Sequence, residues 1–186
     1  VVVVAAMHGN EIAGAALLDR WLRAELRPLR GRLTLVFANL DAYARFDAED
    51  PTASRFLDED LNRVWDAETL DGGRRSSELR RARALRPIFD QADVLLDLHS
   101  MLWPSDPLVL CGQAPRAAEL ALRLGTPGLA VADEGHAGGR RLIDYARFVE
   151  GEAGPTALLV EAGSHWAPET VAQMEASATR LLQLYG

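Results

Sequence analysis

The sequence predicts an α/β fold built on a mainly parallel sheet. The chain opens on six small or β-branched apolar residues, positions 1–6, that do not alternate with polar ones. That pattern is typical of a strand buried on both faces, as strands of parallel sheets are. Further strand-like runs then alternate with helix-like runs to the end of the chain, which is the order of strand–helix–strand units.

The first half of the chain is predicted to hold one helix, one further strand and a long irregular segment. The helix covers residues 11–26 and ends before Pro28, because proline cannot continue a helix. Residues 33–38, Leu-Thr-Leu-Val-Phe-Ala, have strong β character and predict a strand. Residues 39–75 show no clear period, and a segment of that length inside a compact domain is usually functional or disordered.

The second half is predicted to continue the alternation. Ser76 or Ser77 caps a helix that runs to about residue 91, and the next strand, residues 92–98, leads directly into His99. Further strands are expected at residues 107–111, 129–132 and 156–160, and further helices at 115–124 and 168–184. No repeat, low-complexity tract or linker divides the chain, so we expect one domain over residues 1–186.

Composition and charge restrict the kinds of partner. A net charge of −7 and a pI of about 5.1 argue against nucleic acid or an anionic membrane surface as the main partner. No apolar stretch is long enough to span a bilayer and no signal peptide is recognisable, so we expect a cytoplasmic protein. Cys111, the single cysteine, lies in an apolar run and is predicted to be a buried, unreactive thiol. The chain begins at Val1 without a Met, so a missing upstream segment is expected, and a homo-oligomer is compatible with the sequence.

His8 and Glu11 follow the first strand at once, separated by Gly9 and Asn10. An imidazole and a carboxylate three residues apart across a tight turn can bind one small cation, and two histidines with a glutamate form a ligand set of catalytic zinc. The alternative is that His8 hydrogen-bonds the turn and Glu11 only favours the N-terminus of the next helix.

Two more ionisable side chains follow buried strands. His99 comes directly after residues 92–98, and Glu161 comes directly after residues 156–160. The carboxyl ends of parallel strands meet at one edge of a sheet, so His8, His99 and Glu161 are expected to converge there. Taken alone, His99 could cap a helix or lie at the edge of the core, and Glu161 could interact with a helix dipole.

Four short motifs, taken together, resemble those of a known family. They are His8-Gly-Asn-Glu11, Asp60-Leu-Asn62-Arg63, Asp97-Leu-His99-Ser100 and Glu161-Ala-Gly163. In this order and at this spacing they resemble the succinylglutamate desuccinylase and aspartoacylase branch of the zinc carboxypeptidases. The resemblance covers nearly the whole chain and implies a three-layer sandwich with a mainly parallel, mixed central sheet.

The resemblance also implies one zinc ion. It maps the zinc ligands to His8, Glu11 and His99, and the general base to Glu161. The chemistry suits these residue types, because three protein ligands leave zinc a position for a water molecule whose pKa falls to about 7. A nearby carboxylate can then accept the proton of that water and pass it to a leaving amine.

Substrate binding is mapped by the same resemblance to the segment around residue 60. Asn62 and Arg63 correspond to a pair that grips a substrate carboxylate, and Arg55 has the offset of an arginine that polarises the scissile carbonyl. Guanidinium groups bind carboxylates in two-point fashion, which fits the first role. Alternatively, both arginines form salt bridges within their own acidic segment, residues 58–60.

The expected function is that of a zinc-dependent hydrolase that cleaves the amide bond of a small, carboxylate-bearing N-acyl amino acid. A metallocarboxypeptidase acting on short peptides is the nearest alternative. A non-catalytic module that binds metal or carboxylate is the second, although pure binding has no use for Glu161 as a base. The ligand set alone would also admit cobalt, manganese or iron.

The residues that would recognise the substrate side chain are less clearly marked. The resemblance leads us to expect a tyrosine and an arginine four residues apart, but Tyr145 is followed at that offset by Val149. Arg140, Arg141, Tyr145 and Arg147 are therefore candidates, and a solvated loop explains them equally well.

Three further points stay open. Asp97 could orient the ring of His99, or it could be a buried acid satisfied by backbone. His165 and Trp166 could line the pocket or pack against it. The β-domain that often covers the pocket in this family does not follow the last helix here, so we expect a pocket that is open, or closed by a partner subunit or a missing segment.

Overall fold

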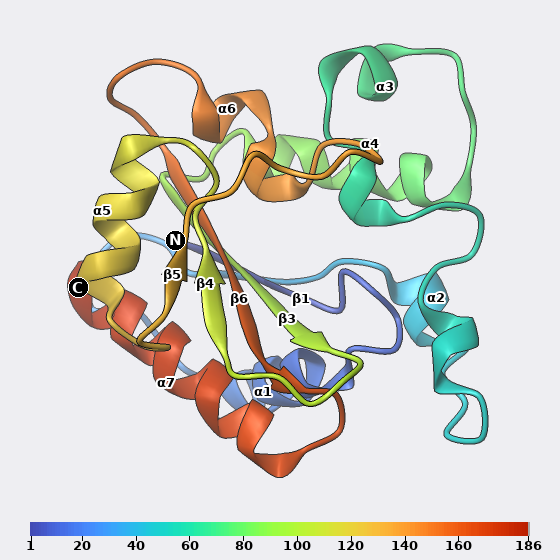
Figure 1. Ribbon diagram of the computed structural model, residues 1–186, viewed down its shortest axis with the longest axis horizontal. Coiled ribbons are helices and arrows are strands. Elements are labelled where there is room, and N and C mark those ends of the chain that lie inside the picture. Colours follow the sequence, from blue (N-terminus) through green and yellow to red (C-terminus); the bar gives the residue numbers. More distant parts are fainter. Residues whose placement is uncertain (186) are drawn as a thin grey trace.

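The computed structural model describes residues 1–185 and contains one six-stranded sheet with helices on both faces (Figure 1). The strands are β1 (Val2–Ala5), β2 (Thr34–Phe37), β3 (Val94–Met101), β4 (Leu108–Leu110), β5 (Ala130–Val131) and β6 (Thr156–Ser164). Their order in the sheet is β2-β1-β3-β6-β4-β5. The first four in this order are parallel, β4 runs antiparallel to β6, and β5 is parallel to β4. The predicted α/β fold with a mainly parallel, mixed sheet is confirmed.

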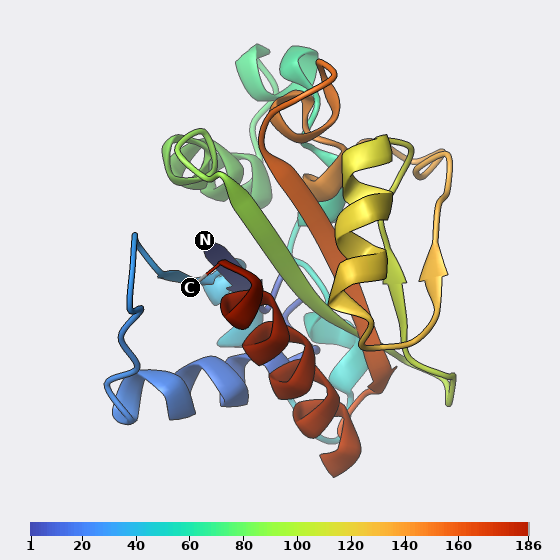
Figure 2. The same cartoon turned by 90° about the vertical axis from the view of Figure 1, so that its left-hand side faces the viewer.

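The helices form two layers. On one face lie α1 (Ile12–Arg23), α5 (Pro115–Leu124) and α7 (Pro168–Tyr185), and on the other lies α4 (Ser77–Phe89) (Figure 1). Helices α5 and α7 lie next to each other on their face (Figure 2). Along β1, Val3 packs into the first of these layers and Val2 and Val4 into the second. The unbroken apolar run at the N-terminus is therefore explained by burial on both faces.

Strands β3 and β6 run three and four residues further than the sequence predicts. His99 and Glu161 lie inside these strands and are register partners, and the register shifts between His99 and Met101. The sequence places the ends of these strands just before the polar residues His99 and Glu161. In the structure the backbone pairing continues past both residues, and Glu161 also pairs with Leu108 of β4.

The long segment between β2 and α4 is ordered into short helices. They are α2 (Leu40–Tyr43), η1 (Pro51–Ser54), η2 (Leu61–Arg63) and α3 (Ala67–Asp71). Two others, η3 (Leu142–Asp144) and α6 (Ala146–Val149), precede β6. None of the helices in residues 1–185 is long and apolar enough to cross a bilayer. Cys111 is buried, as predicted, with its Sγ 3.4 Å from the carbonyl oxygen of Val131.

Candidate metal centre and active site

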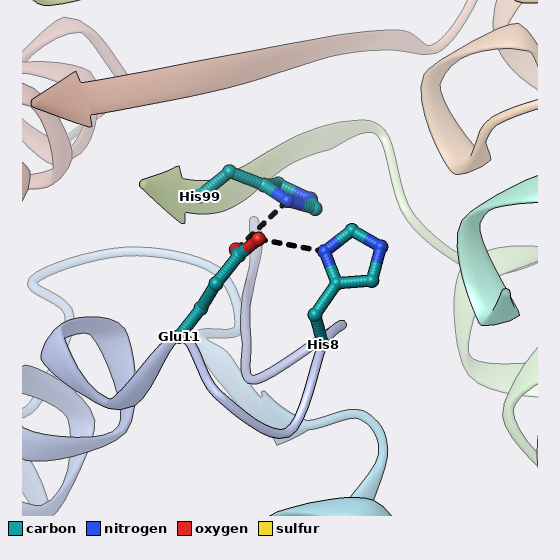
Figure 3. Close-up of side chains that lie close together, drawn as sticks. All are labelled: His8, Glu11 and His99. Carbon is teal, nitrogen blue, oxygen red and sulfur yellow. Dashed lines mark hydrogen bonds and ion pairs between the residues drawn. The ribbon is translucent and has the colours of Figure 1, made fainter. Parts of the chain in front are cut away.

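Three buried side chains meet at the carboxyl edge of the parallel strands. His8, Glu11 and His99 each offer one ligand atom, and these atoms all lie within 4.8 Å of one another. Glu11 lies between the two rings, with Oε1 2.7 Å from His8 Nδ1 and Oε2 3.0 Å from His99 Nδ1 (Figure 3). The predicted convergence of His8 and His99 is therefore found.

The turn after β1 is held in an unusual backbone conformation. Ala6 has a φ of +54°, which costs a non-glycine residue about 1–3 kcal/mol. A Cβ atom on Gly9 would lie only 2.2 Å from the carbonyl oxygen of Ser54, so only glycine fits where the turn packs on η1. Glu11 is the N-cap residue of α1, yet its side chain makes no capping hydrogen bond. The side chain of Glu11 therefore does not cap the helix, which was the alternative role for this residue.

The second ring nitrogen of His8 contacts Asp60. Nε2 lies 2.9 Å from Asp60 Oδ1 and 3.0 Å from Nη2 of Arg55. Carboxylates only accept and guanidinium groups only donate, so we assign the Nε2 proton to the bond with Asp60, while Arg55 donates to Asp60 Oδ2 at 3.2 Å. In the structure Nδ1 in turn donates to Glu11 Oε1 at 2.7 Å; with a metal ion bound, this assignment would leave Nδ1 as the lone-pair nitrogen that faces the cation.

Asp97 plays a comparable part beside His99. Its Oδ2 lies 2.9 Å from Nε2 of His99, but the contact lacks hydrogen-bond geometry, and within residues 1–185 neither carboxylate oxygen has a hydrogen-bond partner. We therefore interpret the contact as an attraction between charges. The alternative in which backbone groups satisfy Asp97 is not found.

The electrostatics of the cluster favour positive charge. Burial disfavours the charged form of each imidazole, but the carboxylates outweigh it, so the pKa of His8 is raised and that of His99 is raised well above its usual value. The pKa of Glu11 is held well below its usual value by the two imidazoles, against the effect of burial. Two imidazole nitrogens and a carboxylate oxygen in such a field fit a divalent cation, which would replace the imidazole protons.

Glu161 lies beside this cluster in a different environment. Burial raises its pKa to about 7, with smaller and opposing contributions from the neighbouring imidazoles and carboxylates. Its Oε2 is buried and has no hydrogen-bond partner within the described part of the chain. A carboxyl group with a pKa near neutrality can both accept and release a proton under ordinary conditions.

The segment around Asp60 brings together the predicted catalytic residue Arg55 and the predicted substrate-binding residues Asn62 and Arg63. Arg55 lies 3.8 Å from Glu11 Oε1 as well as close to Asp60. Asn62 is buried, and its Oδ1 accepts a hydrogen bond from the backbone N–H of Leu142 at 2.8 Å, which leaves its amide donors free. Arg63 donates to the carbonyl oxygen of Asn62 at 2.7 Å. Of the acidic residues 58–60, only Asp60 forms the alternative salt bridges with Arg55 and Arg63.

A cavity of about 620 Å³ lies over the candidate metal site. Its walls include Arg55, Asn62, Arg63, Arg141, Glu161 and His165. The sequence left open whether His165 or Trp166 lines the cavity, and the structure places His165 on its wall. Nδ1 of His165 lies 2.7 Å from the hydroxyl of Ser100. Trp166 instead donates from its indole N–H to the carbonyl oxygen of Asn10.

Of the four candidates for recognition of the substrate side chain, the fold places one on the cavity wall and three elsewhere. Arg141 lines the cavity. Arg140 donates to the carbonyl oxygen of Asp144, Arg147 donates to that of Ala92, and the hydroxyl of Tyr145 donates to Asp90. These three are held by contacts of their own and do not line this cavity.

The sequence alone does not assign a role to two residues that support the site. Glu78, on α4, is fully buried and accepts hydrogen bonds from the backbone N–H groups of Leu57, Asp58 and Glu59. Asp60 belongs to a motif but is indistinguishable by sequence from its acidic neighbours. The role of such a residue becomes visible only from its contacts in the folded chain, and the partners of Glu78 lie about 20 residues away in the sequence.

The fold is an α/β fold with a mainly parallel, mixed sheet, and a cluster of two histidines and a glutamate lies at its carboxyl edge. The chain matches the model of the succinylglutamate desuccinylase/aspartoacylase catalytic domain over residues 1–185. It belongs to that family.

Individual relatives are similar over part of their length. The chain is 38% identical over 141 residues to the "Probable aspartoacylase" of Parasynechococcus marenigrum, covering 70% of this chain and 44% of that protein. It is 33% identical over 109 residues to an N-acyl-aromatic-L-amino acid amidohydrolase (carboxylate-forming) of Xenopus laevis, covering 54% of this chain and 33% of that protein. The chain thus spans less than half the length of these curated relatives.

Solved structures show the same fold. The crystal structure of the succinylglutamate desuccinylase from Chromobacterium violaceum superposes with a TM-score of 0.74 at 19% identity. The match covers 98% of this chain and 59% of that one. At this level of identity the likeness concerns the fold alone.

Proposed function

We propose that the protein is a zinc-dependent deacylase that hydrolyses the amide bond of a small N-acyl amino acid. The observation that carries the proposal is the convergence of His8, Glu11 and His99 within 4.8 Å, beside a buried carboxyl group whose pKa is raised to about 7. Membership of the desuccinylase and aspartoacylase family supports the reaction class.

In this proposal His8, Glu11 and His99 hold one zinc ion, with Asp60 and Asp97 orienting the two imidazoles. Zinc supplies Lewis-acid activation of water and of the scissile carbonyl. Glu161 accepts the proton of the attacking water at its carboxylate and delivers it to the leaving amine. Because Oε2 of Glu161 has no hydrogen-bond partner within residues 1–185, no existing bond has to break first.

Arg55 and the Asn62–Arg63 pair bind the substrate in this proposal. Arg55 donates to the carbonyl oxygen as negative charge develops on it, a contribution worth about 10²–10³-fold in rate for one such donor. The free amide donors of Asn62 and the guanidinium of Arg63 bind the carboxylate of the amino acid. Arg55 exchanges its contacts to Asp60 for the substrate, since its side chain is 37% exposed at the cavity.

The test combines metal analysis with a substrate screen. We expect purified protein to contain one zinc per chain and to release amino acids from N-acyl amino acids faster than from short peptides. The Glu161→Gln variant should keep its zinc and lose about 10²–10⁴-fold in kcat. Glu152→Gln, which removes an exposed carboxylate far from the cavity, serves as the matched control.

Other results would count against the proposal in different ways. Faster turnover of peptides would favour a carboxypeptidase. Unchanged turnover in Glu161→Gln would contradict the assignment of the base. Zinc binding without turnover of either substrate class would indicate a binding module.

A further inference from the structure

His165 is a buried histidine with one partnered and one free ring nitrogen. It comes directly after β6 and is only 5% exposed. Its backbone N–H donates to the carbonyl oxygen of Met101 at 2.7 Å, and its Nδ1 lies 2.7 Å from the hydroxyl of Ser100. Nε2 makes no hydrogen bond among residues 1–185. Because His165 lines the cavity, Nε2 is the polar atom that this ring can offer to a bound molecule.

The contact with Ser100 holds the ring in place without fixing its tautomer. Burial lowers the pKa of His165, so the imidazole is neutral at pH 7 and carries one N–H. A serine hydroxyl can donate or accept. When it donates to Nδ1, Nε2 carries the proton and is a donor, and when it accepts from Nδ1, Nε2 is an acceptor. Rotation of one buried hydroxyl therefore suits Nε2 to a hydroxyl or a carbonyl group of a ligand.

His165 and Arg55 are associated with different oxygens of Glu11. Nη1 of Arg55 lies 3.8 Å from Oε1 of Glu11, and Nη2 of the same guanidinium lies 3.2 Å from Asp60. The other oxygen, Oε2, accepts from the backbone N–H of Ser100 at 3.4 Å. Since the hydroxyl of Ser100 contacts the ring of His165, this ring belongs to the Oε2 side of the site and Arg55 to the Oε1 side.

The proposed binding mode leaves the Oε2 side for the acyl group. In that mode Arg55 donates to the scissile carbonyl, and the Asn62–Arg63 pair binds the carboxylate of the amino acid. Arg55 and Arg63 both contact Asp60, so the amino acid half of the substrate lies on the side of Asp60. The acyl group is the remaining part of the substrate, and it extends from the carbonyl toward His165.

We propose that His165 recognises the acyl group of the substrate through a hydrogen bond between Nε2 and a hydroxyl oxygen on that group. This inference rests on the proposed deacylase function and adds a specificity-determining residue to it. An alkyl group of the same size leaves the buried imidazole without a partner, which is unfavourable for a polar group removed from water. The preferred acyl groups are therefore hydroxyacyl groups.

The first experiment compares two acyl groups of nearly equal size on the unmodified protein. The N-glycoloyl group ends in a hydroxyl where the N-propionyl group ends in a methyl, and both are tested on leucine, phenylalanine, aspartate and glutamate. We expect kcat/KM to be at least about tenfold higher for the N-glycoloyl form of each amino acid that is turned over. Equal turnover of the two forms would overturn the inference and leave the deacylase function intact. No turnover of any of these substrates would contradict the deacylase function itself.

The second experiment removes Nε2. His165→Phe keeps a ring beside Trp166, whose ring centroid lies 5.3 Å from that of His165, and we expect it to lose the roughly tenfold preference for N-glycoloyl over N-propionyl substrates. An unchanged preference, with thermal unfolding showing a folded protein, would overturn the inference.

His136→Phe is the matched control, because His136 also lines the cavity but lies beside Arg63. A Cβ atom on Gly138 would lie 3.1 Å from Nδ1 of His136 and 3.8 Å from Cδ of Arg63. This variant changes a ring next to the amino acid half of the substrate, so the preference between the two acyl groups should stay the same.

Binding of the released acids gives a readout that does not depend on turnover. Glycolate and propionate are the acids that the two substrates release. In the unmodified, zinc-loaded protein we expect glycolate to shift the ¹⁵N resonance of His165 Nε2 and propionate to leave it in place. Equal shifts with both acids would overturn the inference, even if His165→Phe fails to fold.

Discussion

His8 is held by a carboxylate on each side of its ring. Glu11 contacts Nδ1 at 2.7 Å and Asp60 contacts Nε2 at 2.9 Å. Such an outer carboxylate fixes the tautomer and the orientation of a ligand histidine. Asp60 is therefore expected to influence metal binding although it lies outside the three-residue ligand set.

We expect Asp60→Asn to weaken zinc binding by about 10–100-fold, because an amide oxygen holds the Nε2 proton of His8 less strongly than a carboxylate does. Competition with a zinc chelator measures the affinity. Asp58→Asn is the control, since Asp58 belongs to the same segment but accepts its hydrogen bond from the backbone of Ser77. Equal zinc affinity in both variants would contradict the role assigned to Asp60.

Helix α4 supports from behind the segment that we propose to bind the substrate, residues 55–63. The carboxylate of Glu78 receives three consecutive backbone N–H groups, from residues 57 to 59, at 2.8–3.3 Å, together with the amide of Asn39 at 3.2 Å. The segment so anchored carries Arg55 at one end and Asn62 at the other. Its position relative to the cavity thus depends on one buried side chain of a neighbouring helix.

We expect Glu78→Gln to destabilise the fold by about 1–3 kcal/mol, because an amide group turns a donor toward backbone donors and leaves them unsatisfied. The displaced segment should raise KM more than it lowers kcat. Chemical denaturation and steady-state kinetics measure the two effects. Glu68→Gln on the exposed face of α3 is the control, and a fall in kcat at constant KM would argue against a positioning role.

At the scale of the whole molecule, the contacts of Arg141 connect the loop after β5 to η3. Because Arg141 hydrogen-bonds Asp133, the pKa of that carboxyl is lowered, against the opposing effect of burial. A group whose pKa is lower in the folded state stabilises the fold above its unfolded pKa, about 3.9 for aspartate, and this stabilisation is lost as the pH falls through the folded value.

We therefore expect the unmodified protein to exceed Asp133→Asn in free energy of unfolding by about 1 kcal/mol near pH 6. The difference should shrink as the pH falls below about 4, because the carboxyl of Asp133 is protonated first in the unfolded state, and it should vanish once the pH is below the lowered pKa of the folded state. Urea unfolding across this pH range, with chelator present, measures the difference. A difference that stays constant down to pH 2.5 would show that the charge of Asp133 does not stabilise the fold.

Much of the fold could be predicted because its signals are local. The unbroken apolar run of β1, the alternation of strands and helices and the bounds of α5 follow from neighbouring residues alone. The direction of β4 does not, because three residues of the type Leu-Val-Leu are compatible with either orientation. The lengths of β3 and β6 were underestimated, since His99 and Glu161 resemble strand ends until their partners across the sheet are known.

The sequence by itself determined the order of the elements, the family and the convergence of His8, Glu11, His99 and Glu161 near the carboxyl edge of the parallel strands. Only the tertiary structure decided that Arg141 lies on the cavity wall while Arg147 does not, and that Glu78 anchors the backbone of residues 57–59. The physical reason is that the periodicity of helices and strands is encoded locally. The partner of a charged side chain depends instead on residues far away in the chain, and a motif does not record which charges neutralise each other.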